Sequence, residues 1–144
     1  MKRIALVLLA LAVLLGGCTL PKYPCKADTL KWRASIESPI NLYEDSVKLA
    51  HATGRYVLGP VVKDMQAARR AINDTPAPRC VKLARTLLLE QQDSQIKALL
   101  GFIENGDQQL FGNAWNNSNA IYDAYISEMD RLAGDEWHQY QGVK

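Results

Sequence analysis

Apolar residues recur every three or four positions through most of residues 39–134, which is the period of an α-helix with one buried face. The pattern divides into three stretches. Their stripes are Ile40, Tyr43, Val47, Ala50, Gly54, Val57, Val61, Met65, Ala68 and Ile72; then Val81, Ala84, Leu88, Gln92, Ile96, Leu99 and Ile103; then Phe111, Trp115, Ser118, Tyr122, Tyr125, Met129 and Leu132. We therefore predict an all-α fold, an antiparallel up-down bundle of three long helices.

Residues with strong turn or cap preferences mark the ends of these helices. Ser38-Pro39 is a typical helix start, a hydroxyl N-cap followed by proline. Residues 73–78 form a turn rich in proline, and Asn105-Gly106 predicts a left-handed helix stop. Asp107 is then expected to cap the third helix, which ends at Gly134.

Gly59-Pro60 interrupts the first stripe without shifting its phase. Since proline removes a helical hydrogen bond, the first helix is predicted to be kinked or broken there, and the unshifted phase favours a kink. The preceding lead-in is expected to be extended, or to contain a short helix over residues 28–36.

The first 18 residues differ from the rest of the chain. Two cations, Lys2 and Arg3, precede an unbroken apolar run from Ile4 to Leu15. This run is too short to span a bilayer, which takes about 20 residues, so it predicts a signal peptide. The adjoining Leu15-Gly16-Gly17-Cys18 resembles the lipobox of bacterial lipoprotein precursors.

The resemblance implies cleavage before Cys18 and attachment of acyl chains such as palmitate to that cysteine. It implies a cell-envelope protein held by its lipid. Because Thr19 is not aspartate, it implies the outer membrane, facing the periplasm, in a Gram-negative host. In a Gram-positive host it implies the outer face of the plasma membrane. The mature chain resembles small helical bacterial lipoproteins, which implies no particular activity.

This interpretation divides the chain into a signal peptide (1–17), a lipid-anchored tether and lead-in (18–38), the helical bundle (39–134) and a C-terminal tail (135–144). It also changes the charge. The formal net charge of +2 comes from Lys2 and Arg3, so the mature chain is formally neutral. Neutrality gives no electrostatic reason to expect nucleic-acid binding. We expect the membrane and an unknown envelope protein as partners, with the oligomeric state open.

The chain contains three cysteines. With Cys18 lipidated, Cys25 and Cys80 remain in an oxidising compartment, and this even number predicts a disulfide between them. Two unpaired thiols are the alternative. No Cys-x-x-Cys or His-x-x-x-His spacing accompanies His51 and His138, so we expect no metal and no cofactor.

The predicted disulfide restricts the shape of the first helix. A straight helix over residues 39–73 is about 52 Å long, whereas residues 25–39 span at most about 46–50 Å. Either the helix bends near Gly59-Pro60, or it starts later, or the lead-in runs extended along the bundle. We expect a bend together with a mostly extended lead-in that acts as a strap.

Two stripes contain one polar residue each, Gln92 and Ser118. In antiparallel hairpins both are level with Gly59-Pro60, and the carbonyl of Tyr56, which proline leaves unbonded, lies within a turn of them. One hypothesis is a satisfied polar layer that sets the register of the bundle. A second is a small ligand-binding pocket formed by Gln92, Ser118 and Tyr56. A third is that both side chains are simply exposed.

The sequence contains no set of residues typical of catalysis. No Ser/His/Asp arrangement, glycine-rich phosphate loop or pair of carboxylates across a cleft is indicated. We therefore expect no catalytic residues. The leading hypothesis is a non-enzymatic, membrane-anchored bundle that acts in protein interaction or envelope structure, and the alternative is a small-ligand binding protein.

Overall fold

The structure, a computed structural model, describes residues 25–140. Over this range it consists of helices and short turns, without a strand, which confirms the all-α prediction. The predicted signal peptide, Cys18 and the start of the tether lie outside the described residues. The α-helices are α2 (Lys26–Ser35), α3 (Glu37–Ala52), α4 (Leu58–Asp74), α5 (Lys82–Asn105) and α6 (Gln108–Ala133), and the 3-10 segments are η1 (Arg55–Val57), η2 (Arg79–Val81) and η3 (Gly134–Tyr140).

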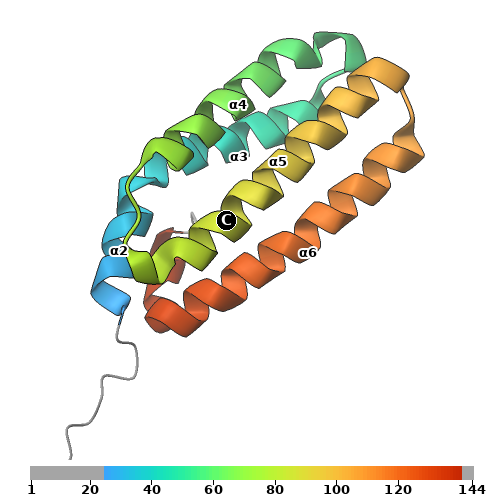
Figure 1. Ribbon diagram of the computed structural model, residues 1–144. Helices are drawn as coiled ribbons and strands as arrows, with labels where there is room; N and C mark the ends of the chain where they lie inside the picture. The colour runs from blue at the N-terminus through green and yellow to red at the C-terminus, as the bar shows by residue number, and fades with distance from the viewer. Residues whose placement is uncertain (1–24, 141–144) are drawn as a thin grey trace, which may run out of the picture.

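Helices α3, α4, α5 and α6 run up and down along one long axis (Figure 1). Each packs mainly on its neighbour in sequence: α3 on α4, α4 on α5, and α5 on α6. The short helix α2 and the segment η3 close one end of this bundle, where α2 contacts both α6 and η3. The prediction of three long helices is therefore corrected to four, because the first predicted helix is two helices.

The break in the first predicted helix lies before Gly59-Pro60. Helix α3 ends at Ala52, Thr53 and Gly54 adopt extended conformations, and α4 begins at Leu58 after η1. Gly59-Pro60 thus lies in the first turn of α4, where proline is tolerated because its missing N–H has no helical partner. The chain reverses between Ala52 and Leu58, so the favoured kink was wrong and the alternative, a break, lies earlier than predicted.

The helical stripes correctly identify most of the buried face despite this reversal. Of the first stripe, the seven buried residues are Ile40, Tyr43, Ala50, Val61, Met65, Ala68 and Ile72. Val57, in contrast, is 60% exposed, because it belongs to the connection between the two helices. The stripe kept its phase across a turn that carries the chain into a separate helix.

The lead-in contains a short helix, as one of its two predicted forms did. Helix α2 covers Lys26–Ser35, close to the range predicted, and only Ile36 separates it from α3. Helix α3 begins at Glu37, so Ser38-Pro39 lies inside its first turn and Ser38 is not the N-cap. The two helices thus follow each other almost without a connection.

The predicted ends of α5 and α6 are confirmed. Gly106 follows α5 with a left-handed φ of 71°, and Gly134 follows α6 with φ 65°. The Asp107 carboxylate caps α6 by accepting hydrogen bonds of 2.9 Å from the backbone N–H groups of Gln109 and Leu110. The local signals at these positions determine the backbone because each depends only on a few neighbouring residues.

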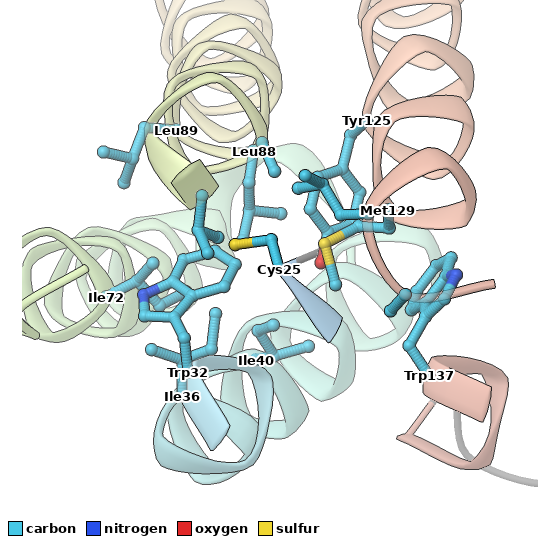
Figure 2. Close-up of a cluster of buried hydrophobic side chains, with 14 residues drawn as sticks. Cys25, Trp32, Ile36, Ile40, Ile72, Leu88, Leu89, Tyr125, Met129 and Trp137 are labelled. Carbon is cyan, nitrogen blue, oxygen red and sulfur yellow. The ribbon is translucent and has the colours of Figure 1, made fainter. Parts of the chain in front are cut away.

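The C-terminal tail is ordered against the bundle through residue 140. In η3, Trp137 is 1% exposed, and its indole N–H donates to the Asp130 carboxylate at 2.7 Å. Figure 2 shows Trp137 and Trp32 on either side of a buried cluster that also contains Ile36, Leu88 and Met129. A second buried cluster, around Met65 and Leu99, fills the opposite half of the bundle.

The structure contains the predicted Cys25–Cys80 disulfide, with the two Cα atoms 6.4 Å apart. It joins the start of α2 to η2. The reversal between α3 and α4 brings the end of α4 back beside α2, so the bridge forms without an extended strap along the bundle. None of the helices among the described residues is both long and apolar enough to cross a membrane.

Candidate ligand-binding cavity

A cavity of about 350 Å³ lies between one face each of α3, α5 and α6. Its lining residues lie on one face of α3 between Ile40 and His51, and on two turns of α5 between Leu88 and Gln95. The third wall is the face of α6 between Trp115 and Tyr125. Because α3 packs on α4 and α6 packs on α5, these outer helices have little direct contact with each other. The space between them is the cavity, at the small end of the range for ligand pockets.

Aromatic rings gather at the two ends of the cavity. At the end closed by α2 and η3, the Tyr125 ring centroid lies 5.8 Å from that of Tyr122 and 5.9 Å from that of Trp137. At the other end, His51 contacts Trp115 edge to face, with centroids 4.7 Å apart. These walls offer a large apolar contact area to a bound molecule.

Buried glutamines of α5 form the floor of the cavity. Gln91, Gln92 and Gln95 are each less than 10% exposed. The Tyr43 hydroxyl reaches this floor from α3, within 3.0 Å of the Gln92 carbonyl and 3.1 Å of Gln95 Oε1. The buried Gln92 Oε1, however, has no hydrogen-bond partner among the described residues. Burying such an oxygen without a partner destabilises the fold by about 1–3 kcal/mol, because no hydrogen bond offsets its desolvation.

A buried cation lines the α2 end of the cavity. Arg33 is 3% exposed, and its Nη2 donates to the Tyr140 carbonyl at 2.6 Å. Its Nε and Nη1 meet no acceptor at full hydrogen-bond geometry among the described residues, although a side-chain hydrogen bond with Arg33 acts to lower the pKa of Tyr125. Glu44 also lines the cavity, but no ion pair joins it to Arg33 within these residues. Charged side chains are almost never buried unless they are paired.

The tyrosine hydroxyls at the cavity are held in their neutral form. Burial raises the pKa of Tyr43, Tyr122 and Tyr125 above the ordinary tyrosine value, because the phenolate loses its hydration. The positive charge of Arg33 opposes this rise in the pKa of Tyr122 and Tyr125 without cancelling it. At neutral pH these groups are therefore hydrogen-bond donors.

The structure separates the three residues of the predicted polar layer. Gln92 lines the cavity, whereas Ser118 is buried but donates to the Trp115 carbonyl of its own helix at 2.7 Å. No hydrogen bond joins Ser118 to Gln92 in the described chain. Tyr56 is 93% exposed and belongs to η1, so it is not part of the layer. No kink leaves the Tyr56 carbonyl unbonded inside a helix, because Pro60 lies in the first turn of α4.

Of the buried polar side chains that line this cavity, sequence reasoning identified Gln92 and missed Arg33, Gln91 and Gln95. Gln95 lies one turn after Gln92 on the same helical face, and this spacing was a usable signal. Arg33 gave no such signal, because a single arginine on a short helix is normally solvated. Its burial depends on η3 folding back over α2, which local sequence does not encode.

The described residues offer one group of side chains close enough to hold a metal ion, Cys25, Asp28 and Cys80. Since the two sulfur atoms are joined in the disulfide, they are not thiolate ligands. This group lies apart from the cavity lining. No protein-family model, curated protein or solved structure matches the chain.

Proposed function

We propose that the protein is a non-enzymatic binding protein that holds a small, largely apolar molecule in the cavity between α3, α5 and α6. The observation that carries this proposal is Gln92, a buried residue of the cavity lining whose Oε1 has no hydrogen-bond partner among the described residues. A core selected only for packing would fill this position with an apolar side chain, since buried polar groups stabilise a protein only when they are hydrogen-bonded.

The lining of the site supports binding over chemistry. Ile40, Val47 and Leu88 provide aliphatic surface, and aromatic groups lie at both ends. The buried polar groups are amides, neutral phenols and one guanidinium, a set suited to orienting a molecule, while Glu44, Lys48 and His51 line the more exposed part. We accordingly propose binding without turnover.

The sequence resemblance to lipoprotein precursors supplies the proposed location. With lipid on Cys18, only residues 19–24 separate the membrane anchor from Cys25 at the start of the bundle. We propose that the bundle stands close to the envelope membrane, where apolar molecules are abundant. A role in binding an envelope protein or in supporting envelope structure, which the sequence predicts, stays a proposal beside this one.

The binding proposal is tested with 10-bromodecan-1-ol, a neutral probe whose bromine quenches tryptophan fluorescence on contact. The full chain is reconstituted in lipid nanodiscs and titrated with the probe. Quenching is expected because Trp115 and Trp137 line the cavity. The substitution Val47→Phe fills the cavity and should abolish this quenching.

The matched control is Leu49→Phe, since Leu49 lies on the same helix but is 54% exposed and does not line the cavity. This variant should be quenched like the unsubstituted protein. Absence of quenching in the unsubstituted protein, or equal quenching in Val47→Phe, contradicts the proposed function.

A further inference from the structure

The positive charge of Arg33 lacks a counter-ion within the described residues, although the side chain is 3% exposed. A guanidinium keeps its proton at every physiological pH, so it does not escape this cost by becoming neutral. Burial of an unpaired charge is destabilising by several kcal/mol. An anionic group entering the cavity would remove part of that cost, because the cation then gains its partner.

We infer that the molecule held in the cavity is an amphipathic monocarboxylate, with its carboxylate on Arg33 and its apolar body directed along α3 toward Trp115. This inference rests on the proposed function and names the chemical class of its ligand. Arg33 Nε and Nη1 are the donors without a backbone acceptor, since Nη2 is occupied by the Tyr140 carbonyl. Both atoms are buried, so the side chain has to turn toward the cavity for a carboxylate to reach them.

A low negative charge suits the electrostatics of this end best. The Glu44 carboxylate lines the same cavity as Arg33, and it lies close enough for its charge to act on both Tyr122 and Tyr125. Glu44 therefore repels any bound anion. It repels a phosphate monoester, which carries more negative charge at neutral pH, more strongly than a carboxylate.

The other cations on the cavity suit a headgroup less well. Lys48 already pairs with Asp45 at 3.0 Å, and both side chains are about three-quarters exposed. His51 is exposed at the Trp115 end. Charges in water attract an anion weakly because the solvent screens them. Arg33 is thus the cation that attracts a carboxylate most strongly.

The dimensions of the cavity indicate the length of the ligand. Its α3 wall runs from Ile40 to His51, eleven residues apart, which corresponds to about 16 Å along the helix. An unbranched chain of about ten carbons fits this length. A hydroxyl or amide group along that body would also supply the donor that Gln92 Oε1 lacks.

The first test compares 10-bromodecanoate with 10-bromodecan-1-ol on the full chain in nanodiscs, by tryptophan quenching. The acid is expected to bind at least about tenfold more tightly than the alcohol, the range for a hydrogen bond to a charged group. Arg33→Met should reduce this preference to about one, whatever its effect on the affinity for the alcohol. Lys48→Met is the matched control and should retain the preference.

The second test determines the orientation of the bound acid in the cavity without altering Arg33. It is therefore informative even if Arg33→Met fails to fold. The bromine of 10-bromodecanoate should quench Trp115, and the bromine of 2-bromodecanoate should quench Trp137. In Trp115→Phe, quenching by the first acid should therefore be largely lost and quenching by the second retained.

The outcomes separate the two proposals. If neither the acid nor the alcohol binds, the cavity is not a binding site and both proposals fail. If the alcohol binds as tightly as the acid, if decyl phosphate binds more tightly than decanoate, or if the orientation is reversed, the binding function stands and the carboxylate inference is overturned.

Discussion

The Tyr43 hydroxyl lies 3.1 Å from Gln95 Oε1 and donates a hydrogen bond that ties α3 to α5 across the cavity floor. Gln92, one turn earlier on α5, has no equivalent partner for its own side-chain oxygen within the described residues. Two buried amides on one helical face therefore contribute to stability with opposite sign. One completes the link between two helices, and the side-chain oxygen of the other has no partner within residues 25–140.

The first prediction follows from this difference. Gln92→Leu should stabilise the ligand-free protein by about 1 kcal/mol, because it removes an unpartnered buried oxygen at nearly constant volume. Tyr43→Phe should destabilise it by about 1 kcal/mol, because the Gln92 carbonyl and Gln95 Oε1 then lose the one hydroxyl that donates to them. Urea unfolding followed by circular dichroism measures both. A loss of stability in Gln92→Leu would show that this amide is satisfied and sets the register of the bundle.

The second prediction concerns Gly106. Its φ of 71° disfavours any side chain, and a Cβ there would collide with the Arg55 guanidinium. Arg55 donates to the Ile103 and Glu104 carbonyls at 2.8–2.9 Å, so displacing it also exposes the end of α5. Gly106→Ala should therefore lower the free energy of unfolding by about 1–2 kcal/mol.

Gly101→Ala is the matched control for that change. Gly101 lies within α5, and a Cβ added there meets no atom within 4 Å. Alanine should raise the free energy of unfolding by about 0.5–1 kcal/mol, because glycine is the poorer helix former. Thermal unfolding of the two variants should shift in opposite directions, and equal shifts would contradict the assignment of Gly106 as a left-handed cap.

The third prediction concerns the disulfide. Cys25 and Cys80 are 55 residues apart in sequence, and closing a loop of that length stabilises the fold by about 4 kcal/mol through the entropy of the unfolded chain. Replacing both cysteines with alanine should lower the stability by that amount. Reductant should then destabilise the unsubstituted protein in urea but leave the double variant unchanged.

The fourth prediction is a loss of stability in alkali. Burial raises the pKa of Tyr43, Tyr122 and Tyr125, so folding favours their protonated forms. Below the unfolded tyrosine pKa of about 10 the protonated form prevails in both states, and stability is independent of these groups. As the pH rises above that value, the tyrosines of the unfolded chain ionise first, so the free energy of unfolding falls.

Unfolding in urea at increasing pH measures this effect, with tyrosinate absorbance as the direct reading. Tyr43→Phe should lose less stability than the unsubstituted protein between about pH 9 and pH 11, since one of the contributing phenols is gone. If both proteins lose stability equally over this range, Tyr43 ionises as readily in the folded state as in the unfolded one.

Sequence and structure compare most clearly at two connections, the one between α5 and α6 and the one between α3 and α4. Gly106 and Asp107 were identified correctly, because a left-handed stop and an N-cap depend on adjacent residues alone. The break at Thr53 and Gly54 was placed too late, at Gly59-Pro60, because the apolar phase happens to continue through η1. Proline favours both the interior break and the first turn of a helix, so Pro60 alone does not distinguish them.

By itself, the sequence determined the helical class, most of the buried stripes, the caps at Gly106, Asp107 and Gly134, and the pairing of Cys25 with Cys80. These follow from periodicity, local hydrogen bonding and the expectation that Cys18 is lipidated, which leaves one pair of cysteines. Only the tertiary structure decided that α3 turns back on α4, and that Arg33 and Gln92 share a cavity while Ser118 and Tyr56 stay outside it. The reason is physical: burial of a polar side chain depends on which distant helix covers it, and that is set when all the apolar faces pack together.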